Sequence, residues 1–157
     1  MTAASSVEQS ACIFCDALAR IETEPLVVFR GQVSFVIVNK FPYNNGHLMV
    51  VPGRHVPRLA DLSSAELVEF IQVTQLAERV LTEVYNPQGL NLGLNLGKAA
   101  GAGVLDHLHM HIVPRWSGDT NFMTVVGTMR VLPEDLGASA ARLRPLFARL
   151  ASGAQPD

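Results

Sequence analysis

Short apolar runs separated by turn residues predict β-strands over the first part of the chain. The run PLVVFRGQVSFVIVNKFP predicts two strands, Leu26–Arg30 and Ser34–Asn39, that turn at Gly31, because β-branched and aromatic residues favour extended backbone. YNNG is a turn signal, and HLMVVP directly after it predicts a third strand that ends at Pro52. The domain is therefore expected to begin as a strand meander.

The pattern then changes to the three-and-four spacing of one helical face, within LSSAELVEFIQVTQLAERVLTEVY. The positions on this face are Leu67, Phe70, Ile71, Thr74, Ala77, Leu81 and Val84. Ser63 followed by Glu66 is a capping box, which fixes the start of the helix, and Leu62 and Leu67 are placed for the accompanying hydrophobic staple. We expect this helix to pack against the sheet and to carry no chemistry.

The remaining elements complete one domain. LNLGLNLG alternates and predicts a strand, KAAGAG predicts a flexible segment, and DHLHMHIVPRW predicts another strand before a loop at SGDTNF. PEDLGASAARLRPLFARLAS predicts a terminal helix that starts near Pro133. Residues 1–11 are expected to form a disordered tail, residues 12–152 a single α+β domain with an antiparallel sheet of about five strands, and residues 153–157 a C-terminal tail.

Composition limits the classes of partner. The chain has 157 residues, of which 48% are hydrophobic and 17% charged, and it carries a formal net charge of -2. This balance gives no electrostatic reason to expect nucleic acid or an anionic membrane as a partner. The sequence has no apolar run as long as a membrane span, and MTAASSVEQSA lacks the features of a signal peptide, so a cytoplasmic location is expected.

Three of the five histidines stand at alternate positions in DHLHMHIVPRW. Because strand side chains alternate between faces, His107, His109 and His111 are expected on one face, with the apolar residues between them on the other. A solvated strand face would more naturally carry Thr, Lys or Glu. Two functional readings remain open at this point: coordination of a transition metal by neutral imidazoles, or one nucleophilic histidine positioned by its neighbours.

A glycine-rich stretch, GLNLGKAAGAG, lies just before these histidines, and Arg115 follows them. Glycine allows backbone N–H groups to approach an anionic ligand closely. Glycines, a cation and imidazoles together predict a phosphate site.

The stretch HLHMHIV followed by PRW resembles the histidine triad (HIT) superfamily, whose mark is His-x-His-x-His with apolar residues between. VNKFPYNNGHLMVVPGRHV is similar to its nucleotide-binding strands, and the continuation PRWSGDTNFMTVVGTMRVLPEDL is similar to its fragile-histidine-triad branch, in particular bacterial diadenosine polyphosphate hydrolases and phosphorylases. The resemblance covers roughly residues 12–150 and implies a HIT-like fold with one long helix and a C-terminal helix.

The resemblance also implies roles for individual residues. His109 matches the nucleophile, which attacks the α-phosphorus while its other ring nitrogen donates to a backbone carbonyl. His111 matches the histidine that contacts the α-phosphate and the bridging oxygen, and His107 and His47 match a supporting pair. Asn39 matches the asparagine that binds the ribose hydroxyls.

The phosphate-binding positions implied by the resemblance are Asn95, Gly101 and Gly103, together with His111. The chain departs from its relatives at two of them. Asn95 stands where fragile-histidine-triad enzymes often carry Gln, and Gly103 where many relatives have a Gln before the triad. Both departures concern contacts to the leaving group.

The two cysteines, Cys12 and Cys15, form a C-x-x-C motif, which in a reducing compartment favours metal or redox chemistry over a structural disulfide. The chain lacks the βαβ context of a thioredoxin-like motif. Some branches of the HIT superfamily, including galactose-1-phosphate uridylyltransferases, bind zinc through such a pair and two histidines. The matching positions here imply a structural zinc site made of Cys12, Cys15, His55 and His107.

The resemblance implies a homodimeric nucleotidyl hydrolase or transferase that cleaves dinucleoside polyphosphates, with diadenosine tetraphosphate as the leading small-molecule substrate and no metal required for the chemistry. Either water or inorganic phosphate could resolve the intermediate. The alternatives are a purine nucleoside phosphoramidase of the same superfamily, a nucleotide-binding signalling module with vestigial turnover, and a metal-dependent enzyme that uses the three histidines as ligands.

Overall fold

The computed structural model describes residues 12–104, 106–119 and 134–153, and a five-stranded sheet forms its centre. The strand order is β1-β2-β3-β5-β4, and every pair of neighbours is antiparallel. The strands are β1 (Val27–Arg30), β2 (Ser34–Val38), β3 (Leu48–Pro52), β4 (Gly89–Leu94) and β5 (Met110–Arg115). The expected antiparallel sheet is therefore confirmed, although β1 begins one residue later and β2 ends one residue earlier than expected.

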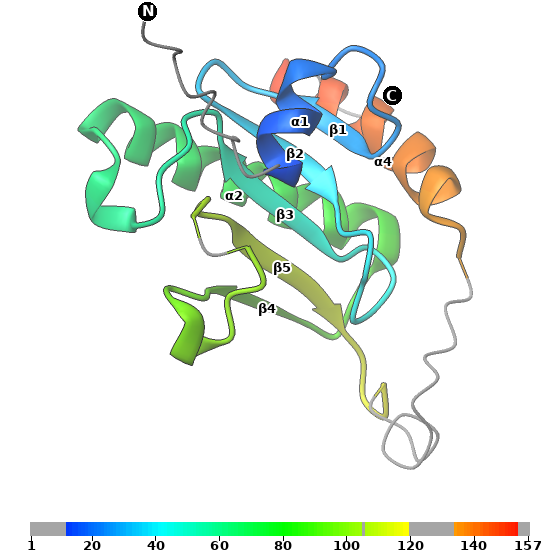
Figure 1. Cartoon of the computed structure of the whole chain (residues 1–157). Coiled ribbons are helices and arrows are strands. Elements are labelled where there is room, and N and C mark those ends of the chain that lie inside the picture. Colours follow the sequence, from blue (N-terminus) through cyan, green and yellow to red (C-terminus); the bar gives the residue numbers. More distant parts are fainter. Residues whose placement is uncertain (1–11, 105, 120–133, 154–157) are drawn as a thin grey trace, which may run out of the picture.

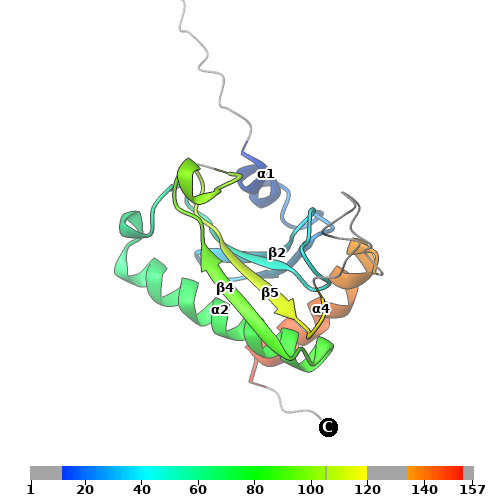
Figure 2. The ribbon, with the colours of Figure 1, turned by 90° about the horizontal axis from the view of Figure 1, so that it is seen from below.

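Helices cover both faces of this sheet (Figure 1). The helices are α1 (Ile13–Ala19), α2 (Ser64–Tyr85) and α4 (Leu136–Ala151), with short 3-10 turns at Leu59–Asp61 and Lys98–Ala100. The long α2 and the C-terminal α4 lie on one face, and α1 lies on the other, as Figure 2 shows from below. In the described part of the chain, no helix is both long and apolar enough to cross a membrane.

Several expectations fall on residues that the structure does not describe. The N-terminal tail 1–11, the start of the last helix near Pro133, the end of the SGDTNF loop and most of the C-terminal tail lie outside the described residues. Within the described part, α4 begins at Leu136, and Asp135 caps it by accepting from the N–H of Ala138. The segment expected to be flexible, KAAGAG, contains the 3-10 turn at Lys98–Ala100.

The long helix α2 begins where the sequence predicts. Ser63 caps it in a full capping box with Glu66, at distances of 3.2 Å and 3.1 Å. The predicted packing face is partly wrong, because Leu67 and Ile71 are 38% and 52% exposed. The buried face is turned slightly around the helix and consists of Phe70, Val73, Thr74, Ala77, Val80 and Leu81.

One polar residue of α2 also forms hydrogen bonds with the turn between β1 and β2. The carboxylate of Glu69 accepts from the N–H groups of Gln32 and Val33, each at 2.7 Å, and from the Ser34 hydroxyl at 2.8 Å. These contacts satisfy the turn between β1 and β2, which would otherwise present unpaired donors beside the helix. Helix α2 therefore packs against the sheet and also stabilises this turn.

Helix α1 was not predicted from the sequence, although Phe14, Ala17, Leu18 and Ile21 have helical spacing. Phe14 and Ala17 are buried in a small core on the α1 face of the sheet, with Phe35 and Met49 among its members. The helix has only seven residues, which is too short to be stable by itself in water. Its position therefore depends on contacts with the rest of the domain.

Candidate functional site

The three triad histidines lie on the α1 face of the sheet, where β5 begins. Strand β5 starts only at Met110, so His107 and His109 belong to the extended segment before it and not to the strand itself. The ladder with β3 ends at the pair formed by Val50 and Met110, and the N–H of Leu108 donates instead to the carbonyl of Val56 at 2.7 Å. The alternation of faces survives, because Leu108 and Ile112 are buried in the core under α2.

The triad histidines are more deeply buried than we expect for side chains on an exposed face of a strand. His107 is 1% exposed and His109 is 5% exposed, and only His111 is partly accessible. The cover is α1, because the Phe14 ring lies 5.3 Å from the His107 ring and 5.0 Å from the His109 ring. Because α1 was not predicted, this burial was not predicted either.

The hydrogen bonds of His109 leave one ring nitrogen available. Its Nδ1 lies 2.9 Å from the backbone carbonyl of His107 and donates to it, because a carbonyl only accepts. A neutral imidazole protonated on Nδ1 carries a free lone pair on Nε2. Burial lowers the pKa of His109, so the ring is neutral around pH 7. The geometry therefore gives His109 the tautomer that a nucleophile needs.

His111 belongs to a relay of hydrogen bonds that starts at the backbone of Tyr43. The N–H of Tyr43 donates to Nδ1 of His47 at 3.1 Å, so a neutral His47 carries its proton on Nε2. That nitrogen lies 2.9 Å from Nδ1 of His111 and 3.2 Å from the amide nitrogen of Asn39. When His47 donates to Nδ1 of His111, His111 carries its own proton on Nε2 and is a donor towards the cavity. Burial also lowers the pKa of His111.

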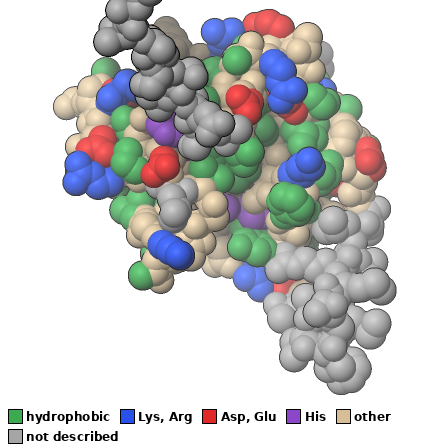
Figure 3. Space-filling model, viewed as in Figure 1, with side chains coloured by type: hydrophobic (Ala, Val, Ile, Leu, Met, Phe, Trp, Pro, Cys, Tyr) green, Lys and Arg blue, Asp and Glu red, His purple; other side chains and the backbone are tan. Residues whose placement is uncertain are grey.

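A cavity of about 720 Å³ opens beside His109 and His111 on the α1 side. Asn39, Asn95, Gly101 and Gly103, which were predicted to bind ribose and phosphate, all line it. Its walls include the apolar side chains Ile13, Phe14, Ala17, Leu26, Ile37, Met49 and Val104. In the space-filling view, histidine atoms reach this face at two places beside hydrophobic side chains (Figure 3). A cavity with apolar walls and a limited number of polar groups suits a nucleoside.

A second cavity of about 430 Å³ lies on the other side of His111, over β5 and β4. Its lining includes Asn44, Asn91, Asn95 and Arg115. Tyr43, Asn95 and His111 line both cavities, so the two spaces meet at these residues. One bound molecule could therefore occupy both.

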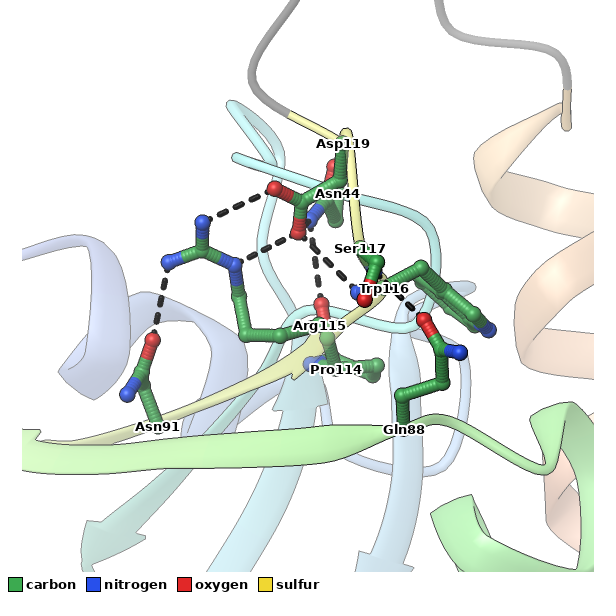
Figure 4. A network of polar contacts seen from close by, with 8 residues as sticks. All are labelled: Asn44, Gln88, Asn91, Pro114, Arg115, Trp116, Ser117 and Asp119. Atoms are coloured by element: carbon green, nitrogen blue, oxygen red, sulfur yellow. Dashed lines mark hydrogen bonds and ion pairs between the residues drawn. The ribbon is translucent and has the colours of Figure 1, made fainter.

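Arg115 is the last residue of β5, and it lines the smaller cavity together with His111 and with Gly93 of the glycine-rich stretch. Its guanidinium pairs with the Asp119 carboxylate at 2.6 Å and 2.9 Å, and it donates to Asn91 at 2.8 Å (Figure 4). Asn44 donates to the same carboxylate and to the carbonyl of Pro114, which joins the loop after β2 to this network. The Arg115 side chain holds the pKa of Asp119 far below its usual range. The network fixes the chain on both sides of the smaller cavity.

A cluster of two cysteines and two histidines beside the triad could hold a metal ion. Cys12, Cys15, His55 and His107 each offer one ligand atom, and these atoms all lie within 4.8 Å of one another. Nδ1 of His107 lies 3.4 Å from Sγ of Cys12 and 3.2 Å from Nδ1 of His55, and Sγ of Cys15 lies 3.3 Å from the latter nitrogen. Tetrahedral zinc with ordinary bond lengths requires ligand separations of about 3.3–3.8 Å.

The chemistry of these donors also fits a cation. Nε2 of His107 donates to the carbonyl of Pro52 at 2.7 Å, so its Nδ1 keeps a lone pair that faces the cysteines. Desolvation and the neighbouring Cys12 thiol raise the pKa of Cys15 to about 11. A bound divalent cation would overcome this by stabilising the thiolate.

The fold and these two clusters define an α+β protein with a histidine site beside a nucleoside-sized cavity. The HIT domain model matches residues 20–118, and the chain belongs to the HIT family. It is 47% identical over 128 residues to an AP-4-A phosphorylase of Mycobacterium tuberculosis, an alignment that covers 82% of this chain and 66% of that protein. The chain thus spans slightly less than two thirds of that relative.

Two further relatives cover more of their own length. The chain is 37% identical over 127 residues to a bis(5'-adenosyl)-triphosphatase of Dictyostelium discoideum, which covers 77% of this chain and 85% of that protein. A crystal structure of a Zn-bound histidine triad family protein from Mycobacterium smegmatis superposes with a TM-score of 0.73 at 28% identity, covering 91% of this chain and 97% of the other. The predicted fold and family are confirmed.

The structure brings together every residue of the predicted metal set, and it places the predicted nucleotide-binding residues around one cavity. The three triad histidines do not form a single three-histidine metal site, since His107 faces the cysteines and His109 bonds to a backbone carbonyl. Phe14 and the rest of α1 were missed as parts of the site. The helical spacing noted above was the signal that could have indicated them.

Proposed function

We propose that the protein is a nucleotidyl transferase that cleaves dinucleoside polyphosphates through a covalent intermediate on His109, with diadenosine tetraphosphate as the substrate. The observation that carries this proposal is the buried His109 ring beside the larger cavity. Its Nδ1 is held by a carbonyl, and its Nε2 has no hydrogen-bond partner among the residues that the structure describes. The names of the relatives, an AP-4-A phosphorylase and a bis(5'-adenosyl)-triphosphatase, support the same substrate class.

In the first step, Nε2 of His109 attacks the α-phosphorus of one nucleotide. A P–N bond forms as the bond to the bridging oxygen breaks, and the remaining polyphosphate leaves with the electron pair. Nε2 of His111, protonated through its contact with His47, donates to a phosphate oxygen and stabilises the charge that develops there. Glycines in the loop at Gly101 and Gly103 leave room for backbone N–H groups to do the same.

In the second step, inorganic phosphate attacks the same phosphorus and the P–N bond breaks, which returns His109 to its neutral form. With diadenosine tetraphosphate the products are ADP and ATP. The similarity to an AP-4-A phosphorylase supports phosphate as the acceptor in this step. Water in the same position would give AMP and ATP.

The pair of cavities supports a dinucleoside substrate. The apolar cavity bounded by α1 accommodates the nucleoside whose phosphorus is attacked, with Asn39 at the ribose. The smaller cavity beyond His111, which Arg115 helps to line, accommodates the leaving half. A mononucleotide would leave this second space unused.

We further propose that Cys12, Cys15, His55 and His107 bind a structural zinc ion. The separations of the ligand atoms support this, as does the Zn-bound relative from Mycobacterium smegmatis. When bound, zinc would supply a fixed tetrahedral crosslink and take no part in the reaction. The ligands come from α1, the segment after β3 and the triad segment, so the ion would tether α1 beside His109.

We also propose a homodimer. Strand β4 is an edge strand, and Leu92 and Leu96, on and just after it, are each 45% exposed. An exposed edge with apolar side chains is a surface that pairing with a second copy would cover.

The experiment that tests the function is incubation with diadenosine tetraphosphate, with and without inorganic phosphate, followed by chromatography of the products. Phosphate-dependent formation of ADP and ATP is expected. AMP and ATP formed without phosphate would overturn the phosphorolytic step alone. Absence of cleavage in both conditions would overturn the proposed function.

A further inference from the structure

The end of the larger cavity away from the histidines holds a carboxylate that the proposed chemistry does not use. Glu24 lines this cavity beside Arg20 and Leu26, and its side chain is 14% exposed. The apolar lining at this end can bind the faces of a base, and a hydrogen bond to the base edge has to come from a polar side chain of the cavity wall, such as Asp16, Arg20 or Glu24. Glu24 is placed to supply one.

Local contacts fix the position of Glu24. Its N–H donates to the carbonyl of Arg20, and its own carbonyl accepts from the N–H of Val27. Oε2 lies 3.2 Å from Nη2 of Arg20, whose Nε donates to the carbonyl of Asp16. Oε1 makes no hydrogen bond to any residue that the structure describes. The carboxylate is therefore held in place and keeps one acceptor oxygen for a ligand.

The register of the sheet sets the distance between His111 and Val27, three residues after Glu24. Val27, Ile37, Met49 and His111 form one straight row across β1, β2, β3 and β5. Three steps between neighbouring strands amount to about 14 Å. A nucleotide that lies along this row, with its phosphate at His111 and its ribose at Asn39, extends its base over Ile37 towards Leu26 and Glu24.

We propose that Glu24 reads the edge of the base and selects nucleotides whose base carries an exocyclic amino group, as adenine does. This inference rests on the proposed function, because it takes the reacting phosphate to lie at His109 and His111. A carboxylate accepts hydrogen bonds and cannot donate them, so it binds an amino group and repels a carbonyl oxygen at the same position. Hypoxanthine, which has a carbonyl where adenine has its amino group, is the matched contrast.

The test compares kcat/KM for diadenosine tetraphosphate and diinosine tetraphosphate in the wild type, in Glu24→Gln and in Glu22→Gln. The wild type should prefer the adenine substrate by about tenfold or more, as expected for a hydrogen bond to a charged group. Glu24→Gln should reduce the preference to within about threefold, because an amide can turn to accept or to donate. The change should appear in KM, with kcat little affected, since Glu24 lies far from the phosphorus.

Glu22→Gln is the control, because Glu22 is 85% exposed, pairs with Arg30 and does not line the cavity. It should keep the wild-type preference. Equal kcat/KM for the two substrates in the wild type, or an unchanged preference in Glu24→Gln, would overturn the inference and leave the proposed function intact.

Calorimetric titration with AMP and IMP measures the affinity for each base without requiring turnover, and it therefore tests the same contact of Glu24. Tighter binding of AMP than of IMP by the wild type, lost in Glu24→Gln, would uphold the role of Glu24 even in a protein that cleaves neither dinucleotide. Equal affinities, or no binding of either nucleotide, would contradict it. Circular dichroism on each variant confirms that the fold is retained.

Discussion

The two faces of the sheet come from the same strands and do different work. On the α2 and α4 face, alternate residues such as Val36, Leu48 and Ile112 are buried in one apolar core. On the α1 face, the residues between them include His109 and His111 and leave cavities of about 720 and 430 Å³. One face is therefore packed for stability, and the other keeps space and polar groups for chemistry.

The covering helices differ in the same way. Helix α2 has 22 residues, a full capping box and a buried apolar face. Helix α1 has seven residues, and its cap, Cys12, makes no side-chain cap hydrogen bond but faces the other candidate metal ligands. Substitutions on the α2 face should therefore affect stability first, and substitutions on the α1 face should affect activity first.

The largest effect is expected from His109→Asn. The variant removes the free Nε2 lone pair, so turnover of diadenosine tetraphosphate should fall by at least about a thousandfold. Initial-rate measurement checks this, and circular dichroism should show a folded protein. Turnover close to the wild-type rate would rule out His109 as the nucleophile.

Two buried phenylalanines compare the faces directly. Phe70→Ala removes a fully buried ring from the α2 side and should lower the free energy of unfolding by about 3–5 kcal/mol, with kcat of the folded protein nearly unchanged. Phe14→Ala removes the ring that contacts His107 and His109, so it should also raise KM and lower kcat. Denaturant titration and steady-state kinetics measure both variants. Equal effects of the two substitutions on kcat and KM would refute the proposal that the α2 face serves stability and the α1 face serves activity.

A smaller effect is expected from loss of the metal site. Cys15→Ser should reduce the zinc content of the purified protein and lower the midpoint of thermal unfolding by more than about 5 °C, because the bound ion stabilises only the folded state. Asp16→Asn on the same helix is the control and should retain zinc. Elemental analysis and calorimetry measure the two quantities. A wild-type protein that contains no zinc and is unaffected by chelators would disprove the assignment.

The smallest effect is expected from Ser63→Ala, which removes one half of the capping box of α2. The free energy of unfolding should fall by about 1 kcal/mol, with no change in kcat or KM. Thermal unfolding and initial rates check the two parts. A change in KM would show that α2 is coupled to the nucleotide site, and it would contradict the separation of stability and activity between the two faces.

Many secondary-structure elements of this molecule could be predicted from the sequence, because their formation depends on residues that are neighbours along the chain. The strand runs and the Ser63–Glu66 capping box are of this kind, and both were confirmed. The roles of His109 and Asn39 came from resemblance to the HIT family and stay predictions, although the structure places both residues at the cavity.

The elements that were missed depend on contacts between distant segments. Helix α1 is short and is held by Phe14 against residues more than ninety positions away. Leu67 and Ile71 have helical spacing but face away from the sheet, because the packing angle of α2 is set by the sheet and not by the helix sequence. The partners of Arg115 and the position of Glu24 likewise follow only from the assembled fold.

The most direct test of the central claim is to trap the covalent intermediate. Diadenosine tetraphosphate labelled at the α-phosphorus is mixed with the protein in the absence of phosphate, the reaction is quenched with alkali, and the peptides are mapped by mass spectrometry. We predict an acid-labile adenylyl group on His109, absent from His109→Asn. An active protein that carries no label on His109, or that carries it on another residue, would contradict the account.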